Sequence, residues 1–305
     1  MTKTALVTGA SGFLGRQVVQ AFEAAGWNTL GTGFTRASPP TILKVNLTEI
    51  TEVSEVLDHV KPSVVVHCAA NRFPDKCDAN PESAKSTNVE ASKLLAEACA
   101  KRHTLLLYIS TDYVFPGRPG EAPYEADGEP APTNIYGQTK LDGEKAILQA
   151  TQEEHLGVVL RVPVLYGKAD EPKDSAVNVL MDALWKSQEE DANVKMDDWA
   201  QRYPTNTEDV ARVCCDISTK YLEDPDARRL LPRILQFSSE DKMTKYEICQ
   251  VFAEIMGLPI DGVVADRQGP EPSAAVQRPM DTHLSTKALR DIGIDVRTQD
   301  FKAWW

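Results

Sequence analysis

Short apolar runs alternate with segments of helical spacing along the first half of the chain. The apolar runs predict strands at residues 4–8, 28–33, 42–47, 63–70, 104–110 and 157–162. Between them apolar residues recur every three or four positions, which predicts helices at 12–25, 50–60, 81–102 and 135–153. The Val-rich run at 63–70 is typical of a central parallel strand covered on both faces. Repeated strand–helix units of this length predict a doubly wound parallel sheet, the Rossmann arrangement of the α/β class.

This regular alternation loosens in the second half of the chain. Residues 116–133 are rich in Pro and Gly and predict a surface loop. Further on, we expect helices near 173–188, 207–222, 244–256 and 285–292, and a strand near 234–238. The pattern predicts a Rossmann domain over 1–166 and a second, smaller α/β domain over 167–305, with the chain returning to the first domain around 203–222.

Composition and charge narrow the class of protein. The 305 residues are 42% hydrophobic and 26% charged, which is ordinary for a soluble globular protein. A net charge of −12 repels phosphate backbones, so we expect no nucleic-acid partner. No apolar run approaches the ~20 residues of a membrane helix, and the chain start leads directly into a strand rather than a signal peptide. We therefore expect a cytoplasmic protein without membrane contact.

The cysteines and histidines do not form the spacing of a metal site. The 6 cysteines show no Cys-x-x-Cys pattern, and the 5 histidines lie far apart in sequence. Cys214 and Cys215 are adjacent, which suits neither a zinc knuckle nor an easy disulfide. We expect most of the cysteines to be small core residues and no metal to be bound.

A glycine-rich turn joins the first predicted strand to the first predicted helix. It reads Gly9-Ala10-Ser11-Gly12-Phe13-Leu14-Gly15. Glycines let the backbone turn tightly and approach a pyrophosphate, and the helix N-terminus offers that group free N–H donors and a partial positive charge. In this context the motif favours a dinucleotide site over a merely structural turn. Its spacing resembles the extended branch of the short-chain dehydrogenase/reductase superfamily.

The second strand indicates which dinucleotide is preferred. In NAD-binding sheets it normally ends in an acidic residue that binds the adenine ribose, but residues 27–36 contain no carboxylate. Arg36 is available for a 2′-phosphate, and Arg16 follows the last glycine of the turn. We therefore expect NADP(H) rather than NAD(H). The alternative is that Arg36 is a solvated loop residue.

A Tyr–Lys pair carries the candidate chemistry. Tyr136 and Lys140 are four residues apart, so they project from one helical face. Free tyrosine has a pKa of ~10, and we expect a neighbouring ammonium and an oxidised nicotinamide to lower it. The pair is similar to the Tyr-x-x-x-Lys of the superfamily, which implies that Lys140 also holds the nicotinamide ribose. The same resemblance implies that Thr111 hydrogen-bonds the reacting carbonyl oxygen and that Asn88 orders the site; taken alone, Asn88 would be read as an amide on a helix surface.

Further segments narrow the resemblance, which extends over essentially the whole chain. Residues Ser110–Phe115 and Arg278-Pro279 resemble dTDP-4-dehydrorhamnose reductases. Longer matches resemble the regulatory beta subunits of methionine adenosyltransferase, and they include 66–70, 139–146, 161–167, 196–199, 201–205, 243–247 and 277–279. In that family the fold holds NADP and serves as a partner of the catalytic subunit that makes S-adenosylmethionine.

The resemblance implies a set of NADP(H) contacts within 1–166, leaving 167–305 for a substrate or a partner. Carried over by motif, together with the turn glycines Gly9 and Gly15, these contacts are Ser11, Gly12, Phe13, Leu14, Phe34, Thr35, Arg36, Asn46, Leu47, Cys68, Ala69, Arg72, Tyr136, Lys140 and Leu165.

The leading interpretation is therefore an NADP-binding regulatory subunit that modulates S-adenosylmethionine synthesis without catalysis of its own. The alternative is an NADPH-dependent reductase of a 4-keto-6-deoxy nucleotide sugar, so the sequence leaves open whether the chain is an enzyme. A third interpretation is a cofactor-sensing scaffold for another partner. The segment 161–164 lacks the tryptophan that the reductases usually place after the sixth strand. The aromatic segment 301–305 is expected either to contact the catalytic subunit or to fold back on the body of the protein.

Overall fold

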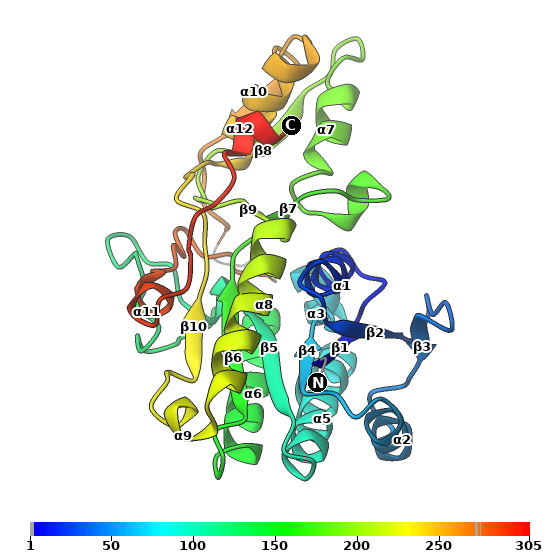
Figure 1. Ribbon diagram of the computed structural model, residues 1–305. Helices are drawn as coiled ribbons and strands as arrows, with labels where there is room; N and C mark the ends of the chain where they lie inside the picture. Colours follow the sequence, from blue (N-terminus) through cyan, green and yellow to red (C-terminus); the bar gives the residue numbers. More distant parts are fainter. Residues whose placement is uncertain (1–2, 272–273, 275) are drawn as a thin grey trace.

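A seven-stranded parallel sheet forms the centre of the computed structural model, which describes residues 3–271, 274 and 276–305 (Figure 1). The strand order is β10-β6-β5-β4-β1-β2-β3. The strands are β1 (Thr4–Thr8), β2 (Asn28–Gly33), β3 (Ile42–Lys44), β4 (Val64–His67), β5 (Leu105–Thr111), β6 (Gly157–Val162) and β10 (Ile234–Gln236). The order reverses between β1 and β4, as in a doubly wound sheet, so the predicted fold class is confirmed.

Helices cover both faces of this sheet. Successive strand residues point to opposite faces, so Val64 and Val66 pack with one helix layer while Val65 packs with the other. The first layer contains α1 (Gly15–Ala24), α8 (Thr207–Glu223) and α11 (Lys287–Asp291); the second contains α2 (Ile50–Val60), α5 (Ala91–Ala100) and α6 (Ile135–Ala150). Burial on both faces explains why the central strands are almost entirely apolar.

A small lobe lies beyond the carboxyl ends of the strands, at the top of Figure 1. We use this name for α7 (Leu180–Lys186), β8 (Val194–Asp197), α10 (Lys245–Met256), β11 (Val263–Asp266) and α12 (Phe301–Trp304). Strands β8 and β11 form a parallel pair, and the helices share a core with it that includes Leu184, Met196 and Phe252. The lobe is therefore assembled from several separate stretches of the second half of the chain.

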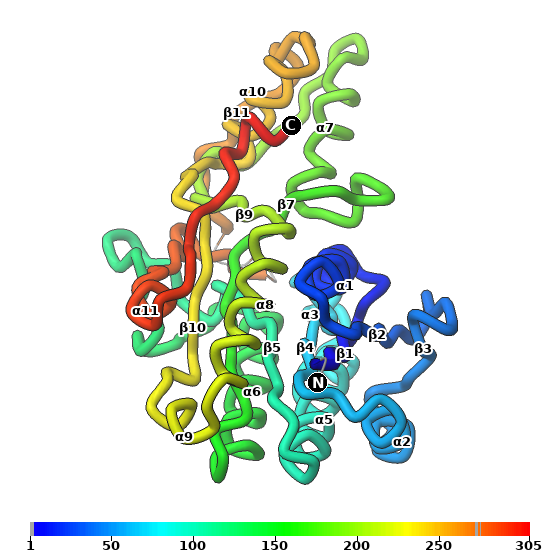
Figure 2. Tube along the Cα trace, viewed as in Figure 1, coloured from blue at the N-terminus to red at the C-terminus, as the bar shows by residue number. Residues whose placement is uncertain are grey.

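The chain runs between the small lobe and the sheet more than once. Strand β7 (Leu165–Tyr166) pairs with β9 (Thr205–Asn206), which leads into α8. Helix α8 then packs beside α1, and β10 joins the edge of the sheet (Figure 2). Helix α9 (Pro225–Arg228) connects the two. The division into domains at residue 166 stays a prediction.

Two helices differ from the sequence prediction. The single helix expected over 81–102 consists of α4 (Pro81–Lys85), a π-helical turn η1 (Ser86–Glu90) and α5, and α3 (Pro74–Ala79) precedes it. The helix expected over 173–188 is the short 3-10 turn η3 (Pro172–Asp174), irregular residues and α7. Here the Ser175 hydroxyl accepts hydrogen bonds from the backbone N–H groups of Val177 and Asn178, which competes with helical pairing.

The chain's aromatic end folds back on the small lobe. Phe301 is fully buried, and its ring lies 4.8 Å from that of Tyr166. Trp305 lies 4.8 Å from Phe252 and is half-buried. Of the two expectations for residues 301–305, packing on the body is the one the structure shows.

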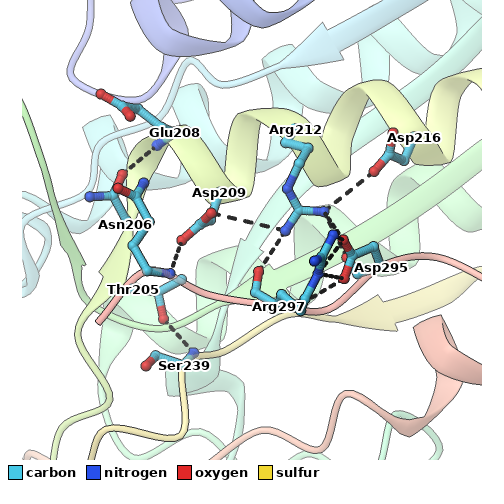
Figure 3. A network of polar contacts seen from close by, with 10 residues as sticks. Thr205, Asn206, Glu208, Asp209, Arg212, Asp216, Ser239, Asp295 and Arg297 are labelled. Atoms are coloured by element: carbon cyan, nitrogen blue, oxygen red, sulfur yellow. Dashed lines mark hydrogen bonds and ion pairs between the residues drawn. The ribbon is translucent and has the colours of Figure 1, made fainter. Parts of the chain in front are cut away.

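A network of polar contacts holds residues 295–299, which precede the aromatic segment 301–305, against α8 (Figure 3). Arg212 of α8 donates to the backbone oxygens of Asp295 and Arg297 and lies near the carboxylates of Asp209 and Asp216. Asp209 also accepts a hydrogen bond from the backbone N–H of Gln299. The segment 295–299 is thus held on α8 before it reaches the small lobe. No helix in the described part of the chain is long and apolar enough to span a membrane.

Candidate cofactor and active site

The turn between β1 and α1 packs its glycines against neighbouring backbone. Gly9 has φ +66°, a left-handed conformation that favours glycine, and a Cβ there would lie 2.9 Å from the backbone nitrogen of Ala69. A Cβ on Gly15 would lie 2.2 Å from the Gly9 carbonyl oxygen. Among the described residues, the backbone N–H groups of Ser11 and Leu14 donate no hydrogen bond. Such free donors beside a helix N-terminus form a site for a phosphate group.

The other predicted cofactor residues follow the carboxyl ends of the strands. Phe34, Thr35 and Arg36 follow β2; Asn46 and Leu47 follow β3; Cys68, Ala69 and Arg72 follow β4; and Leu165 lies in β7, just after β6. Strands β2, β3, β4 and β6 run parallel in the seven-stranded sheet, so the segments that follow them emerge at the same edge of the sheet as the glycine turn (Figure 1). Ligands of doubly wound sheets bind at this edge. The contact of each residue with a cofactor stays a prediction.

The two arginines proposed for the 2′-phosphate have different surroundings. An Nη1 atom of Arg16 lies 2.5 Å from a carboxylate oxygen of Asp170, so this guanidinium already has a counter-charge. Arg36 is exposed and makes no hydrogen bond or ion pair with any residue that the structure describes. The exposed ring of Phe34 lies beside it in sequence, with the Lys44 ammonium 5.9 Å from the ring centre. Of the two arginines, Arg36 is the one available to an incoming phosphate.

Thr111 lies at the end of β5 in a buried polar cluster. Its hydroxyl donates to Asp112 over 3.0 Å and accepts from the backbone N–H of Tyr113 over 3.2 Å. The other carboxylate oxygen of Asp112 accepts from Thr282 at 2.6 Å. Burial raises the pKa of Asp112, and these hydroxyl donors partly oppose that rise. The cluster holds Thr111 in one orientation at the edge where a cofactor is expected.

Tyr136 lies in the first turn of α6 and faces this cluster. Its ring packs edge-on against Tyr113, with the ring centres 6.1 Å apart. Burial raises the pKa of Tyr136 above its ordinary value, and a hydrogen bond involving Thr111 lowers it only in part. We expected a lowered pKa for Tyr136, and the structure gives the opposite direction because burial of the phenol outweighs the hydrogen bond involving Thr111. Tyr136 is therefore protonated at neutral pH and able to donate a proton.

Lys140 follows one helical turn later and is 2% exposed. Its Nζ donates to the Ile109 carbonyl oxygen over 2.7 Å and lies 3.9 Å from the centre of the Tyr108 ring. Burial lowers the pKa of Lys140 to about 7, although the negative charge of Glu144 opposes this. The Lys140 side chain is therefore about half protonated near neutral pH.

Asn88 is a buried residue of the π-helical turn η1, not a surface amide. Its amide oxygen accepts from the Asn71 backbone N–H at 2.8 Å, and its nitrogen donates to the Asn71 carbonyl and to Thr139 Oγ1. Single π-turns inside helices are frequent at functional sites. No described contact joins Asn88 to Tyr136 or Lys140. It therefore positions the loop after β4 and the helix that carries the Tyr–Lys pair.

One buried ion pair beneath the site was not predicted. Glu144, one turn after Lys140 on α6, accepts hydrogen bonds from Arg161 of β6 at 3.0 and 2.8 Å. Ser110, the residue before Thr111, donates to the same carboxylate. The sequence does indicate that Arg161 has a buried partner, because this residue interrupts an otherwise apolar strand and a buried charge requires a counter-charge. No group of three or more His, Cys, Asp or Glu side chains suited to a metal occurs in the described ranges.

A comparison with known families agrees with this geometry. A family model described as the RmlD substrate binding domain matches residues 3–303. The chain belongs to the RmlD substrate binding domain family. This membership extends over both the sheet and the small lobe, as the sequence resemblance indicated.

Two kinds of relative stand out within the family. The methionine adenosyltransferase 2 subunit beta of Mus musculus is 40% identical over 300 residues, which cover 97% of this chain and 84% of that protein. The corresponding subunit of Danio rerio is 38% identical, with 97% and 87% covered. A dTDP-4-dehydrorhamnose reductase of Streptomyces griseus is 35% identical over 208 residues, which cover 68% of this chain and 62% of the enzyme. The likeness to the beta subunits therefore covers more of the chain.

Solved structures share the architecture. A dTDP-4-dehydrorhamnose reductase from Bacillus anthracis str. Ames, in complex with NADP, has a TM-score of 0.81 at 21% identity, covering 100% of this chain and 96% of that one. A UDP-glucose 4-epimerase of Thermus thermophilus, complexed with NAD, has a TM-score of 0.78 at 21% identity, covering 98% and 95%. At this identity the likeness shows the fold, which these structures share with this chain.

Proposed function

We propose that this chain is an NADP(H)-binding beta subunit of a methionine adenosyltransferase. The observation that carries the proposal is the 40% identity to methionine adenosyltransferase 2 subunit beta, which extends over 97% of the chain. The likeness to the reductase of Streptomyces griseus covers 68% of the chain. As a partner of the catalytic subunit, the chain would modulate S-adenosylmethionine synthesis without catalysing it. We propose the cytoplasm as its compartment.

The residues of the sheet edge fit a dinucleotide. Free N–H groups at Ser11 and Leu14 would hold the pyrophosphate, and the unpaired guanidinium of Arg36 would meet a 2′-phosphate. Lys140 would hold the nicotinamide ribose. When bound, NADPH would supply a hydride; the residues of this chain bind and orient it.

The subunit proposal is tested by binding to a methionine adenosyltransferase catalytic subunit from the same organism. The full chain, loaded with NADPH, is titrated against that subunit in a calorimeter. We expect a complex with a dissociation constant below tens of micromolar, about 6–7 kcal/mol of binding free energy. The absence of a complex at that concentration would reject the subunit role. NADPH binding, measured separately, shows whether the tested protein is folded.

The buried aromatic end refines this test. Because Phe301 belongs to the core of the small lobe, removing residues 301–305 unfolds part of that lobe rather than merely trimming a contact. The exposed Lys302, which pairs with Glu254 of α10 at 2.6 Å, offers a gentler probe. Lys302→Gln removes this one surface charge and leaves Phe301 and Trp305 in place. A complex weakened by this variant, with unchanged thermal stability, would locate the interface at the C-terminal helix.

A second function, NADPH-dependent reduction of a 4-keto-6-deoxy nucleotide sugar, is supported by the active-site arrangement. Thr111 and the protonated Tyr136 lie together at the sheet edge, with Lys140 one turn away. Tyr136 would protonate the carbonyl oxygen as the hydride arrives at carbon. Tyr136→Phe should lower turnover by about 10²–10⁴-fold with little change in NADPH affinity. Turnover that survives this change would exclude Tyr136 as the acid, and no turnover in the unaltered protein would exclude the reductase.

A further inference from the structure

His67 lies at the end of β4, where its ring is buried between two hydroxyl groups. The residue is 1% exposed. Its Nδ1 lies 2.6 Å from Thr8 Oγ1 at the end of β1, and its Nε2 lies 3.0 Å from Ser92 Oγ on α5. Strands β1 and β4 are neighbours in the sheet (Figure 1). The ring therefore connects the strand that leads into the glycine turn with a helix that covers one face of the sheet.

The groups on either side of the ring determine the direction of each hydrogen bond. Ser92 has one hydroxyl proton, which it donates over 2.9 Å to the Asn88 carbonyl oxygen, a group that can only accept. Ser92 Oγ therefore accepts from His67, so the ring proton is on Nε2. Nδ1 is then an acceptor for the Thr8 hydroxyl, and Thr8 Oγ1 accepts from the Ala69 backbone N–H over 3.3 Å. The hydrogen bonds run in one direction, through Ala69, Thr8, His67, Ser92 and Asn88 in that order.

The surroundings of His67 keep its ring neutral. Burial, together with the positive charge of Lys140, lowers the pKa of His67 to about 3. A neutral imidazole has one donor and one acceptor nitrogen, and its neighbours decide which is which. Here only the tautomer with the proton on Nε2 satisfies both Thr8 and Ser92.

The two ends of this hydrogen-bonded chain belong to different parts of the candidate site. At one end, the Ala69 backbone packs so closely on the glycine turn that a Cβ on Gly9 would lie 2.9 Å from its nitrogen. At the other end, the Asn88 side chain donates to Thr139, which lies on α6 between the tyrosine and the lysine of the Tyr–Lys pair. The chain therefore joins the turn proposed for the pyrophosphate to the helix proposed for the nicotinamide ribose.

We propose that His67 is a positioning residue for the dinucleotide, which holds the glycine turn and the π-turn at Asn88 in a fixed relation through Thr8 and Ser92. The inference rests on the NADP(H) site proposed above, because a dinucleotide would span both parts. Groups that are held in place before a ligand arrives lose less conformational freedom on binding, so the fixed relation raises affinity. The same relation serves a regulatory subunit and a reductase.

The tautomer is tested by NMR of the full chain with ¹⁵N-labelled histidine near neutral pH. We expect one set of ring signals for His67, with a proton on Nε2 and an unprotonated Nδ1 that accepts a hydrogen bond. Thr8→Val removes the donor to Nδ1 and should shift the Nδ1 signal, whereas Thr8→Ser keeps the hydroxyl and should leave the signal in place. A proton on Nδ1, or a mixture of both tautomers, overturns the proposal.

Ser92→Ala tests the positioning role, because Ser92 is on α5 and makes no described contact with the glycine turn. Removing its hydroxyl leaves the Nε2 proton of His67 without an acceptor, and we expect NADPH affinity to fall about tenfold. Ser218→Ala is the matched control, since Ser218 is also fully buried and donates to the Cys214 carbonyl oxygen within α8. Its NADPH affinity should equal that of the unaltered protein. Fluorescence titration measures the affinities, and thermal unfolding measures the stability of each variant.

Equal NADPH affinity in Ser92→Ala and Ser218→Ala overturns the positioning role. An unaltered protein that binds no NADPH rejects the proposed cofactor instead, and the ring signals then decide whether the hydrogen bonds are linked. If they are, Ser92→Ala shifts the Nδ1 signal on the far side of the His67 ring, and Ser218→Ala does not. An Nδ1 signal unchanged in Ser92→Ala overturns the linkage.

Discussion

Arg161 beneath the sheet edge and Arg202 at the small lobe are both buried, but only one is fully paired. Arg161 is 1% exposed and donates to both carboxylate oxygens of Glu144, at 3.0 and 2.8 Å. Arg202 is 7% exposed, and one of its terminal nitrogens has no hydrogen-bond partner among the residues that the structure describes. A buried charge is costly unless paired, so a fold that supplies the partner uses the residue as structure. At Arg202 the described part of the fold leaves one buried donor unsatisfied.

The paired arginine lies directly beneath the candidate chemistry. Glu144 follows Lys140 on α6, and Ser110, which also donates to Glu144, precedes Thr111 on β5. Arg161 further reaches the Ala126 carbonyl and the Gln236 amide oxygen, so the pair joins α6, β5, β6 and β10. The relative position of Thr111 and Lys140 therefore depends on a salt bridge in which neither residue takes part.

The largest effect is expected from breaking the paired arginine. Arg161→Leu leaves the Glu144 carboxylate buried without a counter-charge, which should lower the free energy of unfolding by about 3–5 kcal/mol. Urea denaturation followed by circular dichroism measures this. The double variant Arg161→Leu/Glu144→Leu removes both charges and should recover most of the loss. A single variant that loses less than about 1 kcal/mol would contradict the role assigned to the pair.

A second contrast between a paired and an unpaired arginine occurs at the surface beside the glycine turn. Arg16 is paired with Asp170, whereas Arg36 has no partner among the described residues. Arg36→Ala should weaken NADPH binding by about 1.5–3 kcal/mol, because a charge-assisted hydrogen bond to the 2′-phosphate is lost. NADH lacks that phosphate, so its affinity should not change. Fluorescence titration with both cofactors decides the matter. An equal loss of affinity for NADPH and NADH would mean that Arg36 does not contact the 2′-phosphate.

Lys140 lies between the pair and the cofactor edge, and its charge should make stability depend on pH. Burial lowers the pKa of Lys140 to about 7 in the folded protein, against ~10.4 in an unfolded chain. Between these values the unfolded chain binds more protons, so this lysine destabilises the protein fully below about pH 7 and progressively less as the pH rises toward 10.

Comparison with Lys140→Met isolates this contribution. The stability of the unaltered protein should rise relative to the variant by up to about 1.4 kcal/mol per pH unit above pH 7. Urea denaturation of both proteins at pH 6.5, 7.5 and 8.5 tests it. Parallel profiles would show that Lys140 titrates as an ordinary lysine.

The smallest effect on stability is expected at the unpaired arginine. Arg202→Gln removes one hydrogen bond to the Gln201 carbonyl and a long ion pair with the partly exposed Asp197. The loss in the free energy of unfolding should be smaller than at Arg161, because Asp197 is partly exposed and its charge does not stay buried without a partner. Urea titration of this variant and of Arg161→Gln measures both free energies of unfolding. We expect the larger loss in Arg161→Gln. Equal losses at both positions would mean that Arg202 is structural as well.

The fold followed from local features of the sequence. Apolar strands such as 64–66 bury both faces and must lie in a covered parallel sheet, whatever the rest of the chain does. The spacing of Gly9, Gly12 and Gly15 predicted the turn, because only glycine fits where backbone meets backbone. The spacing of Tyr136 and Lys140 placed both on one face of α6. Each of these inferences concerns residues within one element or at its end.

Contacts between residues distant in sequence determined the features that the sequence did not predict. The π-turn at Ser86–Glu90 interrupts the predicted helix because Asn88 bonds to Asn71 and Thr139, which are distant in sequence. Arg161 could be recognised as a charge in an apolar strand, but its partner on α6 could not be named from spacing.

By itself, the sequence determined the doubly wound sheet, the cofactor turn and the Tyr–Lys pair, since periodicity and steric demand act along the chain. Only the tertiary structure decided that Arg161 meets Glu144 and that Arg202 lies beside Met243 and Asp197. It also decided that the aromatic end packs on Tyr166. Electrostatic matching depends on which side chains become neighbours in space. The sequence therefore does not show that Arg161 meets Glu144 at 2.8 Å while Arg202 stays 3.7 Å from Asp197.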